Sequence, residues 1–120
     1  MIKGPERIAE KVAVAQLRAY MVGLQKYRSI FAEEFGLEAG ARMWPWVFGD
    51  KCPLPALSKI LQRAEDGYGL APMDYYNQLT ILCRFMPEVL VFVNASLILA
   101  DMPMLPEEAP LSILRGWQVE

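Results

Sequence analysis

The sequence LTILCRFMPEVLVFVNASLILADMPML, residues 79–105, decides the fold of this chain. Its apolar residues run on without the alternation of a half-buried strand, which favours buried helix, although Val89, Val91 and Val93 keep a strand as the alternative. Pro87 interrupts the run and suits the first turn of a new helix. We therefore expect two helices, one up to residue 86 and one from residue 87 to about 101, as the central hairpin of a helical bundle.

The same run is too short for a membrane-spanning helix. A span needs about 20 continuous apolar residues, whereas the cleanest part, Val89–Ala100, has twelve and includes Asn94 and Ser96. Extension toward the N-terminus brings in Glu88 and Arg84, which would place charge inside the bilayer. We therefore expect no membrane span.

Glycine and proline divide the rest of the chain into further elements. The segment from Gly4-Pro5 to Phe35 predicts one long helix that ends at Gly36. The remaining predicted elements are a short helix over 37–48 broken by Pro45, a loop over 49–55, helices over 54–66 and 72–86, and a tail over 102–120 that is extended or partly helical near 111–117. The sequence thus predicts a single all-α domain over residues 1–120, a compact bundle of four to six helices with a long N-terminal helix and a Pro-rich C-terminal tail.

The first helix carries two apolar stripes at helical spacing, where a surface helix needs only one. One stripe holds Val14, Leu17, Met21, Leu24, Phe31 and Phe35, and its neighbour holds Ile8, Val12, Ala15, Ala19 and Val22. One stripe can serve the core and the other a symmetric partner, which predicts a homodimer. The small residues Ala15, Ala19 and Gly23 also share a line that lets another helix approach closely, and we favour ordinary packing over a dimerisation device there.

Charge is divided unevenly along the chain. Residues 1–63 have a net charge of +4 and residues 64–120 of −6, so the halves could attract each other within one fold or between copies. In a helix-turn-helix over 54–66 and 72–86, the second helix would carry an acidic residue, Asp74, and only one cation, Arg84. DNA phosphates would repel such a helix. Direct nucleic-acid binding is therefore not expected.

The residue types that usually carry catalysis are scarce. The chain has no histidine, the commonest general base and a frequent metal ligand, and two cysteines cannot supply a zinc cage. The acidic pairs Glu33-Glu34 and Glu65-Asp66 are adjacent residues, whose side chains point apart on a helix. We expect no enzyme activity, catalytic residue, cofactor or metal.

The cysteines and the N-terminal charges bear on location and reactivity. Charged residues crowd the start of the chain, so no cleavable signal peptide is visible and we expect a cytoplasmic protein. Cys52, beside Lys51 in a predicted loop, is the more plausible reactive thiol. Cys83 lies in an apolar stretch and is expected to be a small core residue.

The strongest functional signal is aromatic. Trp44-Pro45-Trp46-Val47-Phe48 places three large aromatic residues within five positions, and tryptophan is among the residues most enriched in interface hot spots. The alternative is that all three fill the core. Two tryptophans separated by one residue rarely face the same way on a helix, so we expect at least one to be partly exposed.

Composition points toward binding to another protein. The chain is 54% hydrophobic with mean hydropathy +0.19, and a domain of 120 residues buries its apolar surface incompletely. We expect a non-enzymatic regulator, an antiactivator-like inhibitor or an adaptor that masks a partner protein's interface. Bacterial antiactivators and phage-encoded inhibitors are proteins of this size. The alternative is a structural or assembly subunit of a larger complex such as a phage particle. The predicted partner or dimer interface comprises Leu17, Met21, Leu24, Trp44, Trp46, Phe48, Met102 and Met104.

Overall fold

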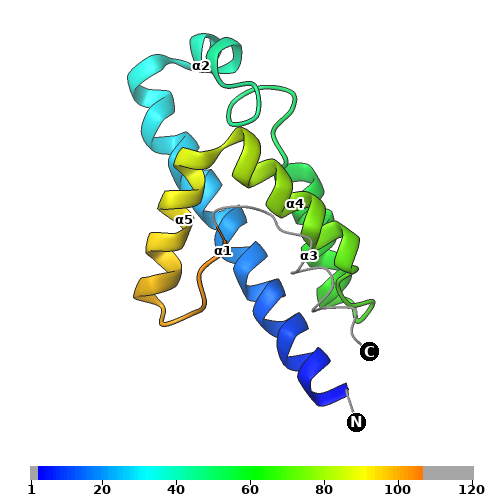
Figure 1. Ribbon diagram of the computed structural model, residues 1–120. Helices are drawn as coiled ribbons and strands as arrows, with labels where there is room; N and C mark the ends of the chain where they lie inside the picture. Colours follow the sequence, from blue (N-terminus) through cyan, green and yellow to red (C-terminus); the bar gives the residue numbers. More distant parts are fainter. Residues whose placement is uncertain (1–2, 107–120) are drawn as a thin grey trace.

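The computed structural model describes the backbone of residues 3–106 and the side chains of residues 10–106. Every regular element in this part of the chain is a helix (Figure 1). The elements are α1 (Lys3–Phe35), α2 (Leu37–Met43), α3 (Leu54–Glu65), α4 (Pro72–Phe85) and α5 (Pro87–Leu99). The prediction of an all-α fold with a long first helix is confirmed, and the segment considered for a strand is α5. The helical turn predicted over 111–117 lies outside the described residues.

The long helix α1 is the spine of the molecule. Figure 1 shows α5 running antiparallel to α1 along one side, with α3 and α4 on the other side and α2 at the C-terminal end of α1. α3 and α5 both pack on α1, and α4 packs on α5. The core is formed by fully buried side chains from four helices, among them Leu17, Tyr20, Leu24, Leu57, Leu79, Leu82, Val93 and Leu97.

Glycines end two of the helices where the sequence predicts. Gly36 adopts φ 80° after α1, and its N–H donates to the Ala32 carbonyl at 2.9 Å. Gly67 adopts φ 96° after α3, where the Tyr68 N–H donates to the Arg63 carbonyl at 3.0 Å. Both are left-handed caps that satisfy the last carbonyls of a helix.

The second helix is shorter than predicted. α2 ends at Met43, and a series of turns replaces the helix expected up to residue 48. The physical reason is Pro45, because the residue before a proline is pushed out of the helical region. Trp44 accordingly has φ −132° and ψ 73°.

Helix α5 is covered less completely than predicted. Val89, Leu90, Val93 and Leu97 are buried, but on the opposite side Val91 is 70%, Ile98 59% and Leu99 89% exposed. A central hairpin, as predicted for residues 79–105, would be covered on more than one face, and for α5 that prediction is wrong. The reason is position: α5 lies at the edge of the bundle, where α1 and α4 cover one face.

Residues 102–106, which we call the C-terminal strap, return across the bundle after α5. The strap is extended, and Leu105 is buried among the core side chains. The side-chain amide of Asn94 pairs with the backbone of Leu105, accepting from its N–H at 2.8 Å and donating to its carbonyl at 2.9 Å. The amide of Gln16 donates to the Pro103 carbonyl at 2.9 Å. These bonds fix the strap against α1 and α5.

One buried hydroxyl offers a direct test of this core. The Tyr20 hydroxyl has no hydrogen-bond partner among the described residues, and burial raises the pKa of Tyr20, so the group stays protonated. Replacing Tyr20 by Phe removes an unsatisfied polar group, and we expect the free energy of unfolding to rise by about 1 kcal/mol in urea titration. The matched control is Tyr75→Phe, which removes a hydroxyl that donates to Gln16 at 2.6 Å and should destabilise the fold. A loss of stability in Tyr20→Phe would contradict this account.

Candidate protein-interaction surface

Five aromatic side chains meet where α1 turns into α2, and we call them the aromatic elbow. They are Tyr27, Phe31, Phe35, Trp44 and Phe48. The first three follow one another at intervals of four along α1, with ring centroids 4.5 Å and then 6.1 Å apart. Trp44 continues the row, 5.4 Å from Phe35 and 6.1 Å from Phe48. The elbow is thus one connected cluster drawn from two segments of the chain.

Two glycines allow the elbow to close. Gly36 reverses the chain in the left-handed region, which glycine adopts without steric cost. Gly40 then packs directly on Phe48, because a Cβ atom at Gly40 would lie 3.0 Å from two ring atoms. A side chain at Gly40 would move α2 away from Phe48, whereas a side chain at Gly36 would strain the backbone at its positive φ.

The elbow encloses a hollow of about 100 Å³. Binding sites for drug-sized molecules are larger, about 300–1,000 Å³. The hollow therefore suits a single apolar side chain better than a whole small-molecule ligand. Leu37 and Met43 are each 63% exposed on the neighbouring helix α2, and Phe35 is 44% exposed, so apolar surface extends beyond the hollow.

The inner end of the elbow is joined to α5. Tyr27 meets Phe92 edge to face, with ring centroids 6.1 Å apart. Partial burial, and then the nearby carboxylate of Glu88, raise the pKa of Tyr27 above its usual value. The phenol is therefore neutral at physiological pH, and the elbow contains no charged aromatic ring.

The structure separates the two tryptophans of the predicted aromatic corner. Trp44 and Phe48 belong to the elbow, whereas Trp46 stacks on Phe85 of α4. The two ring centroids are 4.3 Å apart and the ring planes are inclined by 10°. The Lys51 ammonium lies 5.6 Å from the Trp46 ring centroid. Both tryptophans are partly exposed, in keeping with the expectation for at least one of them. Phe48 is the buried member of the elbow.

The other predicted interface residues occupy different surroundings. Leu17 and Leu24 have no exposed surface, so within one chain they belong to the core. Met21 and Met102 are half-buried against that core, and Met104 is exposed on the strap. The eight residues therefore do not form one continuous surface.

Sequence reasoning missed Gln16 and Asn94 as the amides that hold the strap, and it did not predict that Leu105 returns to the core from the tail. Gln16 is buried and also accepts the hydroxyl of Tyr75, whose pKa burial raises to about 12. A signal was present in the sequence: each amide interrupts a stretch of apolar helix, and a buried polar side chain needs a partner. The sequence does not say which backbone segment supplies that partner.

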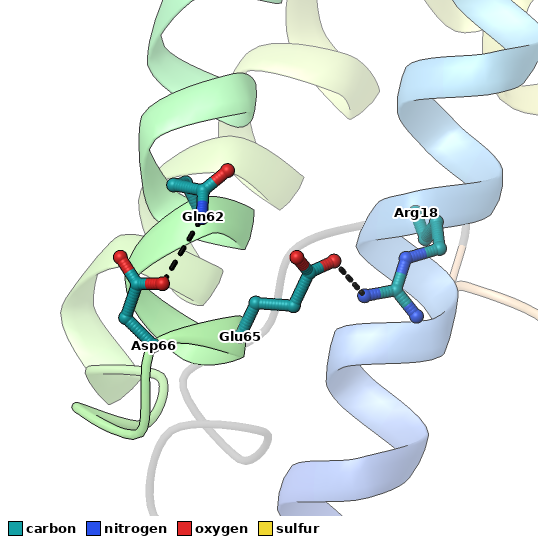
Figure 2. A network of polar contacts seen from close by, with 4 residues as sticks. All are labelled: Arg18, Gln62, Glu65 and Asp66. Atoms are coloured by element: carbon teal, nitrogen blue, oxygen red, sulfur yellow. Dashed lines mark hydrogen bonds and ion pairs between the residues drawn. The ribbon is translucent and has the colours of Figure 1, made fainter.

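A hollow of about 390 Å³ lies between α1 and the end of α3. Figure 2 shows the ion pair across it, in which Arg18 Nη2 lies 3.8 Å from Glu65 Oε2. Glu10 accepts the Leu70 N–H at 2.6 Å on the same side. Lys11 adds a second cation, so positive and negative side chains balance among the described lining residues. Both partners of the ion pair are at least half exposed, and such pairs contribute little to stability.

Three further findings bear on the kind of site the chain can hold. Within the described residues, no group of three or more Cys, Asp or Glu side chains is placed to hold a metal ion. No single described helix is long and apolar enough to cross a membrane, and α4 with α5 reaches that length and composition only as a pair bent by 118°. Comparison with known proteins identifies no matching family, no curated relative and no similar solved structure.

Proposed function

We propose that this chain is a non-enzymatic regulator that binds another protein through the aromatic elbow and masks that partner's interface. The observation that carries the proposal is the hollow between Tyr27, Phe31, Phe35, Trp44 and Phe48. Clusters of aromatic side chains around a small recess are typical of the hot spots that dominate protein interfaces. The occupant we propose is an amphipathic helix of the partner that inserts one aliphatic side chain into the hollow.

The surroundings of the hollow support this occupant. Exposed Leu37 and Met43 offer apolar contacts beside the anchor, and methionine adapts its shape to a partner. Glu38 and Arg42, both exposed on α2, can supply the polar rim that such interfaces carry. A regulator of this kind needs no chemistry of its own, because covering a partner's assembly surface is sufficient.

The test compares Trp44→Ala with Val91→Ala, an exposed apolar residue on α5 that lies outside the elbow. Wild-type and variant proteins are used as baits in native lysate. Each captured protein is purified and titrated against the wild type, Trp44→Ala and Val91→Ala. Loss of an interface tryptophan removes about 2 kcal/mol or more, so we expect Trp44→Ala to weaken binding at least about 30-fold and Val91→Ala to leave it nearly unchanged. Circular dichroism is the check that both variants are folded.

Two outcomes would contradict the elbow as docking surface. One is a purified partner that binds Trp44→Ala as tightly as wild type. The other is a partner lost only by Val91→Ala, which would move the contact to α5. Trp46→Ala is unsuitable as a control, because Trp46 is stacked on Phe85 and its loss also removes packing on α4.

A second candidate function is a subunit of a larger assembly, and the exposed face of α5 favours it. Val91, Ile98 and Leu99 give the molecule a second apolar surface, separate from the elbow. A subunit with several neighbours uses more than one such surface. Light scattering after size-exclusion chromatography distinguishes the two functions, because open-ended oligomers support the subunit and a monomer or closed dimer supports the regulator.

A further inference from the structure

The contacts that hold the C-terminal strap are made by helix side chains to strap backbone. Asn94 of α5 pairs with both the N–H and the carbonyl of Leu105, and Gln16 of α1 donates to the carbonyl of Pro103. The Cys83 thiol of α4 lies 3.4 Å from the Pro106 carbonyl. These side chains line what we call the groove, between α1, α4 and α5. The groove thus holds a strap segment with a buried leucine. A strap of identical sequence from another copy would satisfy the same groove.

The strap joins α5 through a residue in an unfavourable conformation. Asp101 has φ 57°, the one described non-glycine residue with positive φ. Its N–H donates to the Ile98 carbonyl at 3.0 Å, and the Met102 N–H donates to the Leu97 carbonyl at 2.9 Å. This is the cap in which glycine is the usual residue, because a Cβ atom is strained there. Opening the chain at Asp101 relieves that strain without removing any contact inside the groove.

Exposed apolar side chains flank Asp101, which we call the hinge. Leu99 is 89% and Ile98 59% exposed immediately before Asp101, and Met104 is 55% exposed just after it. Val91 continues the exposed face two turns earlier on α5. A single closed chain leaves this surface in water. A second chain that crosses at the hinge would cover it.

We propose that two copies of this chain exchange their straps, so that residues 102–106 of each occupy the groove between α1, α4 and α5 of the other. The groove contacts are then the same as in the closed chain, now made between copies. Two gains are specific to the exchanged dimer: Asp101 leaves the left-handed region, and the apolar residues beside each hinge face the crossing chain. The dimer is closed and symmetric, because each copy gives one strap and receives one.

A disulfide placed across the groove reports which chain supplies the strap. Pro106→Cys in a Cys52→Ser background sets a new thiol beside Cys83, where the Pro106 carbonyl is already in contact. Protein equilibrated at micromolar and at millimolar concentration is diluted, oxidised, denatured and run without reductant. We expect monomer with an internal disulfide at low concentration and covalent dimer as the main product at high concentration.

Two matched variants control for random collision. Met104→Cys in the same background carries an exposed thiol on the same strap, and its dimer yield measures collision alone. Leu105→Glu added to the Pro106→Cys chain removes the buried anchor and should abolish both disulfide products. Internal disulfide at every concentration would overturn the proposal, as would a Pro106→Cys dimer yield no higher than that of Met104→Cys.

The hinge gives a second test that leaves the groove unchanged. Asp101→Gly removes the strain of the closed form, and because each dimer has two hinges we expect the dimer dissociation constant to rise about 30-fold or more. Asp101→Pro cannot adopt positive φ and should favour the dimer. Light scattering measures both, with circular dichroism as the check on folding. A monomer at all concentrations for wild type and Asp101→Pro would overturn the proposal.

The groove could instead hold only the strap of its own chain, and one further measurement decides this. Leu105→Glu releases its own strap, so a synthetic peptide of residues 102–106 should bind to it and not to Leu105→Glu/Asn94→Ala. Peptide binding together with a wild-type dimer supports exchange. Peptide binding by a chain whose wild type never dimerises means that the groove holds the strap of its own chain, and it overturns the second copy as occupant.

Discussion

Replacing Leu17 by Glu is expected to unfold the chain. Leu17 has no exposed surface and lies in the middle of α1, where it is surrounded by core residues. An unpaired carboxylate there either remains charged in an apolar environment or takes up a proton, and both carry a large free-energy cost. The loss, more than about 4 kcal/mol, is comparable with the whole stability of a small domain, about 5–15 kcal/mol.

Circular dichroism and urea titration measure this effect, and Val22→Glu is the matched control. Val22 lies on the same helix and is 41% exposed, so the same substitution there should cost less than about 1 kcal/mol. A Leu17→Glu chain with wild-type helicity and stability would contradict the core described here. If that chain stayed folded but lost self-association, Leu17 would belong to an interface between copies.

The order and type of the helices could be predicted because the residues that begin and end them act through local backbone geometry. Gly36, Gly67, Pro72 and Pro87 each occupy a helix boundary in the structure. Glycine ends a helix through a conformation that other residues avoid, and proline starts one because its missing N–H costs nothing in the first turn. Neither effect depends on tertiary packing, so both can be inferred from sequence.

The covered face of α5 could not be predicted in the same way. Its residues are apolar on all sides, so no polar stripe marks the side that faces water. Only the position of α5 at the edge of the bundle determines that Val93 is buried and Val91 exposed. A central hairpin was the natural expectation for such an apolar segment, and tertiary arrangement overrode it.

The candidate interaction surface could be predicted in part. The density of aromatic residues around Pro45 identified Trp44 and Phe48, but Tyr27 was outside the predicted stripes and Phe31 was assigned to one of them. The chain reversal at Gly36 joins these segments, and its direction depends on backbone geometry that composition does not specify. The separation of Trp46 from Trp44 follows from the turns that Pro45 introduces after α2.

Replacing Gly23 by Leu is expected to force α1 and α5 apart. A Cβ atom at Gly23 would lie 2.9 Å from Val93 Cγ2 and 3.8 Å from Phe92 Cδ2, so α5 approaches α1 closely where α1 has no side chain. Val93 is fully buried and β-branched, which leaves it little freedom to move aside. Overpacking of this kind costs about 3 kcal/mol, measured by urea titration.

A double-mutant cycle isolates the contact from helix propensity. Gly23→Ala gains about 1 kcal/mol of helix propensity but places its methyl group against Val93. In a Val93→Ala background the obstruction is absent, so Gly23→Ala should be more favourable there by about 1 kcal/mol or more. Equal effects in the two backgrounds would contradict the close approach of the helices. Coupling would show that the small residues on α1 include one that serves packing within the chain.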